Sequence, residues 1–228
     1  MYTISSPDVA RFDLQNARPF VEFWDKCYGV DDVKVLGSEE RIDYFAELNI
    51  ANDLTEENVR RLLRWKDPRH LTHLVLSGPN EGKSNQKVEK VLACLGLINQ
   101  FRHDQAPESG MRPAADQAFE SGIVWKAFLL HIAKPHTYPI ADQNVFRAWS
   151  LHTGLKDEKT WDTYAAYCNY FAQIAEAMGI DRTMKLENIR ELKRIDNALF
   201  VFGQLLGDYY EPATQARSSA TTEAGPAR

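Results

Sequence analysis

Hydrophobic residues recur along most of the chain at steps of three and four, the spacing of one face of an α-helix. Phe20, Phe23 and Trp24 follow this spacing near the N-terminus. Thr55 precedes a second such segment and is a suitable N-cap, because its hydroxyl can accept a hydrogen bond from the first helical turn. The segments that we expect to be helical span 20–27, 55–66, 85–101, 124–132, 144–153, 161–178 and 189–206.

One run is strand-like, and it has no evident partner. Residues 71–77 read LTHLVLS, and a single strand has no stable sheet to join. We therefore predict an all-α fold. Residues 104–117 contain proline and glycine and predict a connector between two helical lobes, at about 1–103 and 118–210. Residues 211–228 are small and polar and predict a disordered tail.

Composition places the chain among globular proteins. It has 228 residues, of which 44% are hydrophobic and 26% charged, enough to bury a core. No apolar run reaches the roughly 20 residues of a membrane span, and the N-terminus lacks the apolar segment of a signal peptide. We expect an intracellular, cytoplasmic protein without a membrane partner. The three cysteines lie far apart, which predicts neither a disulfide framework nor a redox pair.

Charge is unevenly distributed along the chain. The net charge of −5 argues against a nucleic-acid partner, since such proteins usually present a basic surface. Residues 1–50 carry five basic and ten acidic side chains, whereas residues 58–90 carry eight basic and three acidic ones. The average over the whole chain therefore conceals a local positive strip.

One loop resembles a phosphate-binding P-loop. Residues 78–84 read GPNEGKS and lie between an apolar run and a predicted helix. The spacing is one residue shorter than the P-loop pattern, so the backbone N–H groups would not form the full nest, and Glu81 would place a carboxylate beside phosphate. A helix-capping loop is the favoured interpretation, with nucleotide binding as the alternative.

The most informative segment runs from Ser121 to Trp149. It reads SGIVWKAFLLHIAKPHTYPIADQNVFRAW and combines a glycine-containing turn, an apolar helix and a proline-rich connection. The connection ends at Asp142, which stands at the expected N-cap of the next helix. A carboxylate at that position is stabilised by the N–H groups of the first turn.

This segment resembles the helix-hairpin-helix DNA glycosylase superfamily. Residues 121–127, SGIVWKA, are similar to the family's hairpin pattern GxGxxxA, with serine and isoleucine in place of its two glycines. Residues 139–147, PIADQNVFR, are similar to the family's PVDTHVxR, with one additional alanine. The resemblance covers residues 121–149. It implies a two-lobed, all-helical fold in which Asp142 takes the place of the catalytic acid.

The resemblance also implies a reaction. Members of the family hydrolyse the bond between a base and its sugar in DNA without a cofactor, and Asp142 would stabilise the positive charge that develops on the sugar or deprotonate the attacking water. Bifunctional members carry a lysine at the position of Trp125. Lys126 is one residue away, which on a helix is about 100° of rotation. We therefore expect monofunctional, water-using chemistry and retain Lys126 as a candidate catalytic residue.

Further residues are candidates for contacts with the base and with DNA. An extruded base can stack on aromatic rings and form hydrogen bonds with polar side chains, and the candidates are Trp125, His131, His136, Tyr138 and Gln143. Backbone N–H groups of a hairpin and basic side chains can hold phosphate. The candidates for that contact are Ser121, Gly122, Ile123, Val124, Lys126, Arg60, Arg61 and Arg64.

Each candidate also has a purely structural explanation, as a cap, a packed ring or a solvated helix face. The alternative to an enzyme is a non-catalytic nucleic-acid-binding or scaffold protein with the same fold, which the acidic net charge favours. His70 and His73 are the closest histidine pair, but the sequence has no recognised metal-ligand pattern. We therefore predict no metal site.

Overall fold

The computed structural model describes residues 14–219 except 30–31, 35–40, 73 and 121. The described residues form ten α-helices, one short 3₁₀ helix and one sheet, in which β1 and β2 pair antiparallel. The prediction of an all-α fold is confirmed in this coarse sense. The elements are η2 (Leu14–Asn16), α1 (Ala17–Asp25), β1 (Asp32–Lys34), β2 (Arg41–Asp43), α2 (Tyr44–Glu47), α3 (Glu56–Lys66), α4 (Gln86–Ala93), α5 (Leu95–Arg102), α6 (Glu108–Ala118), α7 (Ile123–Ala133), α8 (Gln143–Thr153), α9 (Trp161–Ala177) and α10 (Leu186–Ser219).

The predicted helical segments correspond to observed helices. Thr55 caps α3 with a full capping box: its hydroxyl accepts a bond from the Asn58 N–H, and the Asn58 side chain accepts one from the Thr55 N–H, each at 3.1 Å. The segment predicted as one helix at 85–101 is divided into α4 and α5 at Cys94, whose backbone has φ −92° and ψ 3°. Helix α10 continues to Ser219, beyond the expected end and into the predicted tail.

The described residues of the strand-like run 71–77 join no sheet, as its lack of a partner predicted. The described residues of this run form one isolated bridge, between Leu74 and Ser84, because the chain turns back on itself after Leu76 instead of meeting a second strand. The sheet is instead β1 with β2, where Val33 lies opposite Ile42. The hydrophobic pattern did not predict these strands, since three residues are too few to show a period.

Helix α6 occupies most of the stretch 104–117, where an irregular connector was expected. Pro113 lies inside this helix, and a proline there removes one backbone hydrogen bond. Met111, Ala115 and Ala118 are spaced by four and three residues and are buried, and α6 packs against α7. The burial of this apolar face offsets the lost backbone hydrogen bond. The composition of residues 104–117 alone does not reveal that burial.

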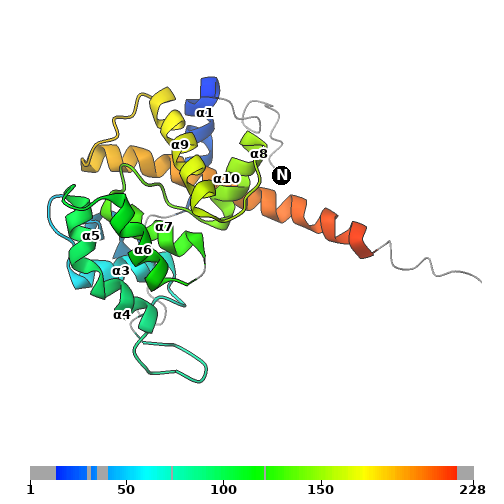
Figure 1. The fold of residues 1–228 in the computed structure, drawn as a ribbon. Helices are drawn as coiled ribbons and strands as arrows, with labels where there is room; N and C mark the ends of the chain where they lie inside the picture. Colours follow the sequence, from blue (N-terminus) through cyan, green and yellow to red (C-terminus); the bar gives the residue numbers. More distant parts are fainter. Residues whose placement is uncertain (1–13, 30–31, 35–40, 73, 121, 220–228) are drawn as a thin grey trace, which may run out of the picture.

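The helices form two groups (Figure 1). Helices α3–α7 lie together, and α1, α8, α9 and α10 form the second group. Helix α10 packs against both α1 and α8, so the first α-helix of the described residues lies with the last ones. The chain enters the first group after α1 and returns to the second between α7 and α8. Asp142 lies at the end of that return.

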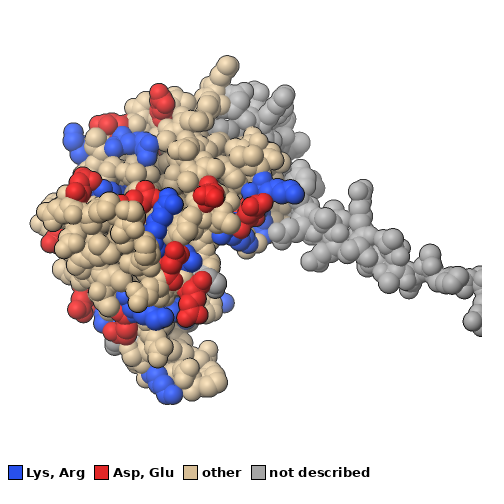
Figure 2. Space-filling model, in the orientation of Figure 1, with Lys and Arg blue, Asp and Glu red and all other residues tan. Residues whose placement is uncertain are grey.

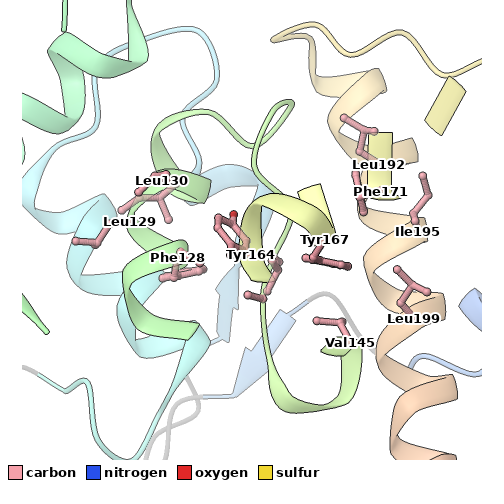
Figure 3. Close-up of a cluster of buried hydrophobic side chains, with 14 of the residues drawn as sticks. Phe128, Leu129, Leu130, Val145, Tyr164, Tyr167, Phe171, Leu192, Ile195 and Leu199 are labelled. Atoms are coloured by element: carbon pink, nitrogen blue, oxygen red, sulfur yellow. The ribbon is translucent and has the colours of Figure 1, made fainter. Parts of the chain in front are cut away.

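The hydrophobic core is continuous across the two groups. In Figure 3 the rings of α9 lie between side chains of α7 and of α10. All of the labelled side chains are buried. The labelled residues are Phe128, Leu129 and Leu130 of α7, Val145 of α8, Tyr164, Tyr167 and Phe171 of α9, and Leu192, Ile195 and Leu199 of α10.

Two properties of the described residues bear on the earlier expectations. No helix among them combines the length and the apolar composition that crossing a bilayer requires. The three cysteines are free thiols: Cys27 is exposed, and Cys94 and Cys168 are half-buried.

Helices α8 and α10 approach each other backbone to backbone at Gly203. A Cβ atom on Gly203 would lie 1.8 Å from the carbonyl oxygen of Asn144, far inside van der Waals contact. Asn144 is two residues from Asp142, so this crossing holds the start of α8 against α10.

We therefore expect Gly203→Ala to destabilise the protein by about 1–3 kcal/mol, as overpacking of a core does, because the two backbones have to separate. Gly96→Ala in α5 is the matched control: a Cβ there meets no atom within 4 Å, and alanine is favoured over glycine in helices by about 1 kcal/mol. Urea denaturation measures both free energies of unfolding. Equal effects of the two substitutions on the free energy of unfolding would contradict the close approach of α8 and α10 at Gly203.

Candidate functional site

A pocket of about 170 Å³ lies where α3, α8 and α10 meet, between the two groups of helices. Its walls combine carboxylates, lysines and aromatic rings. Charged groups in such a place must pair with one another, because removing them from water is costly. We call it the Asp142 pocket, and the residues that matter most in it are Tyr28, Trp65, Lys66, Asp142, Lys193 and Asp196.

Asp142 has two roles in this pocket. It is the N-cap of α8, and its Oδ1 accepts hydrogen bonds from the backbone N–H groups of Asn144 at 2.6 Å and of Val145 at 3.0 Å. Capping therefore uses one carboxylate oxygen and leaves Oδ2 for the pocket that the residue also lines. The two N–H donors fix the orientation of the carboxylate.

Lys66 connects α3 to the residue before Asp142. Its Nζ donates a hydrogen bond to the carbonyl oxygen of Ala141 at 3.0 Å. Burial lowers the pKa of the Lys66 amine, and the carboxylates of Asp142 and Asp196 oppose this shift. A lysine in such surroundings can carry a proton or, when neutral, act as a nucleophile.

Lys193 is held inside a set of aromatic rings. The residue is 5% exposed, and its Nζ donates a hydrogen bond to the side-chain oxygen of Asn197. The same nitrogen lies 4.6 Å from the ring centroid of Tyr28 and 5.7 Å from that of Trp65. Ring faces stabilise a desolvated cation, so this lysine supplies a positive charge at the wall of the pocket.

Asp196 is the buried acid of the pocket. Burial raises the pKa of its carboxyl to about 7, although the positive charge of Lys193 opposes the shift. The carboxyl accepts long hydrogen bonds, of 3.4 Å each, from the Ile140 N–H and the Tyr167 hydroxyl. The pocket therefore combines an acid oriented by a helix terminus with a second acid that exchanges its proton near neutral pH.

Trp125 and Lys126 do not line the Asp142 pocket. The ring of Trp125 stacks on that of Phe119, with centroids 6.2 Å apart, and the Lys126 Nζ lies 2.7 Å from a carboxylate oxygen of Asp116. Both contacts join the start of α7 to the end of α6. In the structure these two residues stabilise the helical hairpin. The tryptophan that lines the pocket is Trp65 of α3.

His131 is a buried core histidine. Its Nδ1–H donates to the Tyr138 carbonyl oxygen at 2.6 Å, so its Nε2 accepts a bond from the Tyr44 hydroxyl, at 2.5 Å. Burial lowers the pKa of His131 to about 3, which keeps the ring neutral. Its two hydrogen bonds connect α7 to α2 and to the loop before Asp142.

The other predicted base contacts also lie outside the Asp142 pocket. The Tyr138 hydroxyl donates to Glu108 at 2.8 Å, in a separate hollow beside α9. The His136 Nδ1 lies 3.3 Å from the sulfur of Met184. Gln143 is exposed at the first position of α8. Of the residues predicted to contact the base or the sugar, the structure therefore brings only Asp142 into this pocket.

The predicted hairpin contains a glycine that its backbone requires. Gly122 has φ 88° and precedes α7, and this left-handed conformation favours glycine. Gly122 is exposed, Val124 is half-buried and Ile123 is buried. Ser121 lies outside the described residues.

Two arginines of the predicted basic strip are neutralised by carboxylates. Arg61 lies 2.6 Å from a carboxylate oxygen of Glu47, and Arg60 lies 3.4 Å from one of Glu89. Arg64 is half-buried in the last turn of α3. The carboxylate partners come from α2 and α4, so the positive balance of the sequence does not translate into a row of unpaired arginines.

Sequence reasoning missed the lysines and the second acid of the pocket, although a signal was present. Lys66 follows Val59, Leu62 and Leu63 at helical spacing, which places a lysine on the apolar face of α3. Lys193 and Asp196 each follow a buried apolar residue of α10 and are themselves buried. A charged residue at an inward position of an amphipathic helix is the pattern that would have identified them. Within the described part of the chain, no group of three or more His, Cys, Asp or Glu could hold a metal.

The raised pKa of Asp196 predicts a pH-dependent stability. The folded state keeps this proton up to about pH 7, whereas an unfolded aspartate loses it near pH 4. The folded state therefore binds more protons between these values, and its stability falls as the pH rises through them. Asp196→Asn mimics the protonated form. We therefore expect the effect of this substitution on the free energy of unfolding to be more favourable at pH 8 than at pH 5, by on the order of 2 kcal/mol.

Urea denaturation at the two pH values measures this difference. Asp208→Asn, at an exposed position of the same helix, is the control for the loss of one carboxylate from α10. A pH-independent effect of Asp196→Asn would contradict the raised pKa of Asp196.

Comparison with known proteins identifies no relative. No family model matches the chain, and no curated protein or solved structure gives a significant match. The Asp142 pocket and the motif at residues 121–149 are therefore the observations on which a functional conclusion rests.

Proposed function

We propose that the protein hydrolyses the N-glycosidic bond of a damaged or modified base in DNA, with Asp142 as the essential carboxylate. The observation that carries the proposal is the position of Asp142: a helix N-terminus orients its carboxylate at the wall of a pocket between the two groups of helices. The order of elements also supports it, because α6, the turn at Gly122 and α7 form a helical hairpin just before this acid.

The pocket suits the charges of this reaction. Cleavage of the bond leaves positive charge on the sugar, which a fixed carboxylate stabilises, and negative charge on the departing base. Asp142 supplies the first partner, and Lys66 and Lys193 supply cations for the second. Asp196, with a pKa of about 7, is suited to donate a proton to the departing base. An extruded base would stack on the ring of Trp65 or Tyr28.

Asp142→Asn separates chemistry from capping, because asparagine caps helices as well as aspartate does. We expect base release from duplexes with damaged bases to fall by about 100-fold or more, while the melting temperature and DNA affinity stay close to those of the wild type. Lys126→Ala is the control and should retain activity, since this lysine pairs with Asp116 outside the pocket.

A panel of duplexes, each containing one deaminated, oxidised or alkylated base, measures release of the free base. Activity that Asp142→Asn leaves unchanged would refute the mechanism. Binding without release by the wild type, insensitive to this substitution, would instead assign the protein to the non-catalytic, nucleic-acid-binding class.

Water is the proposed nucleophile, since Lys126 is paired elsewhere and the Lys66 Nζ is engaged by the Ala141 carbonyl. We therefore expect no covalent complex when the protein is mixed with an abasic duplex and sodium borohydride, which reduces an imine between lysine and the opened sugar. Denaturing electrophoresis detects such a complex. A cross-link that Lys66→Arg abolishes would show that this lysine attacks the sugar and would contradict the monofunctional mechanism.

A further inference from the structure

A larger groove, of about 550 Å³, lies beside the N-terminal end of α4 and outside the Asp142 pocket. One wall is the loop 74–84, which projects from the molecule at the bottom of Figure 1. The other wall is the end of α6 with the two residues that follow it. We call it the α4 groove, and the residues on which its properties depend are Lys83, Ser84, Lys87, Lys90, Phe119 and Glu120.

The α4 groove is lined by more positive than negative charge. Lys83, Lys87 and Lys90 are all exposed, and Lys87 and Lys90 are three residues apart on α4. Glu120 is the acidic residue among the lining residues, and its carboxylate lies 4.0 Å from the Lys90 Nζ. In Figure 2 basic and acidic side chains are interspersed over the face shown, and the loop at the bottom carries a basic one.

These lysines differ from the basic residues that the sequence singled out. Arg60, Arg61 and Lys126 each lie within 3.4 Å of a carboxylate oxygen, so they would have to break an ion pair before they could contact phosphate. Lys87 has no ion pair within the described part of the chain, and the Lys83 Nζ bonds to an amide oxygen, that of Asn80, at 3.2 Å. Exposed, weakly paired lysines release counterions when they meet a polyanion.

The loop at this wall has a defined shape. Its ends are joined by the Leu74–Ser84 bridge, and the Val75 N–H donates to the Lys83 carbonyl oxygen at 2.9 Å. The Gly82 N–H in turn donates to the Val75 carbonyl oxygen, also at 2.9 Å. These bonds hold Lys83 and Ser84 at the edge of the groove.

The same bonds argue against a nucleotide site in the loop GPNEGKS. Besides the Gly82 N–H, the Glu81 and Lys83 N–H groups donate to carbonyl oxygens within the loop, those of Gly78 and Asn80. Three of the amides that a P-loop would present to phosphate are therefore already used. What remains for a ligand is the row of lysine side chains, which suits separate phosphates along a backbone better than one triphosphate.

The second wall of the groove is close to the hairpin in sequence. Phe119 and Glu120 form this wall, and α7 begins at Ile123. Three residues span at most about 11 Å of chain, so a DNA strand bound at the start of α7 can also reach this wall. Resting on the function proposed above, we propose that Lys83, Lys87 and Lys90 bind backbone phosphates of the DNA that supplies the base, and that Glu120 limits the affinity of this contact.

The test is DNA binding by a variant with Lys83→Ala, Lys87→Ala and Lys90→Ala. The control carries Lys156→Ala, Lys159→Ala and Lys185→Ala, which remove the same charge from exposed positions outside the groove. Fluorescence anisotropy with a duplex that contains a stable abasic analogue gives the affinity at several salt concentrations. We expect the groove variant to bind about tenfold or more weakly and its salt slope to fall by up to about 2.7, at about 0.9 per phosphate contact.

Glu120→Gln tests for the opposite effect on the affinity for DNA. Removal of the carboxylate should tighten binding, which general damage to the fold cannot do. Equal affinities of the two triple variants, or unchanged binding by Glu120→Gln, would overturn the proposal. So would thermal protection by Mg·ATP that is lost in the groove triple variant, since it would assign the groove to a nucleotide.

Failure of the groove proposal can be distinguished from failure of the proposed function. Base release at saturating protein depends on Asp142 and should survive in the groove triple variant. If release persists while the groove variant binds DNA like its control, the groove proposal alone fails. If the wild type binds DNA without salt dependence and releases no base, the proposed function fails and the groove proposal fails with it.

Discussion

The Asp142 pocket depends on the electrostatic attraction between lysines and carboxylates that lie between two groups of helices. Lys193 and Asp196 come from α10, Lys66 from α3, and Asp142 from the start of α8. Each would be costly to bury alone, since a desolvated charge needs a partner. Together they make the lining of the pocket polar at this junction. The same requirement explains the rings around Lys193, which stabilise a cation that is largely removed from water.

Much of the helical structure could be predicted from the sequence, because apolar spacing and capping are local properties. Thr55 and Asp142 were both identified as N-caps, and both accept hydrogen bonds from the first turn of the helix that follows. Local rules were weaker where burial decided the outcome. Helix α6 tolerates Pro113 because its apolar face is covered by α7. The composition of residues 104–117 does not predict this contact.

The candidate site was less predictable, because its members are distant in sequence. Lys66 and Asp142 meet only after the chain has left one group of helices and returned to the other. The motif at residues 139–147 identified Asp142, but the hairpin motif at residues 121–127 pointed to Trp125 and Lys126, whose side chains contact Phe119 and Asp116. Which face of a helix meets which neighbour is set by tertiary packing. Similarly, a count of arginines could not reveal that Glu47 and Glu89 neutralise two of them.

The close approach at Gly203 has a mechanical consequence. Side chains between two helices act as a cushion that changes rotamer when one helix shifts, whereas two backbones in contact have nothing that can yield. Because the backbones of α8 and α10 touch near Asn144, we expect the two helices to shift together there. A wider entrance to the pocket would then require displacement of the opposite wall, α3, and loss of the hydrogen bond that Lys66 donates to Ala141.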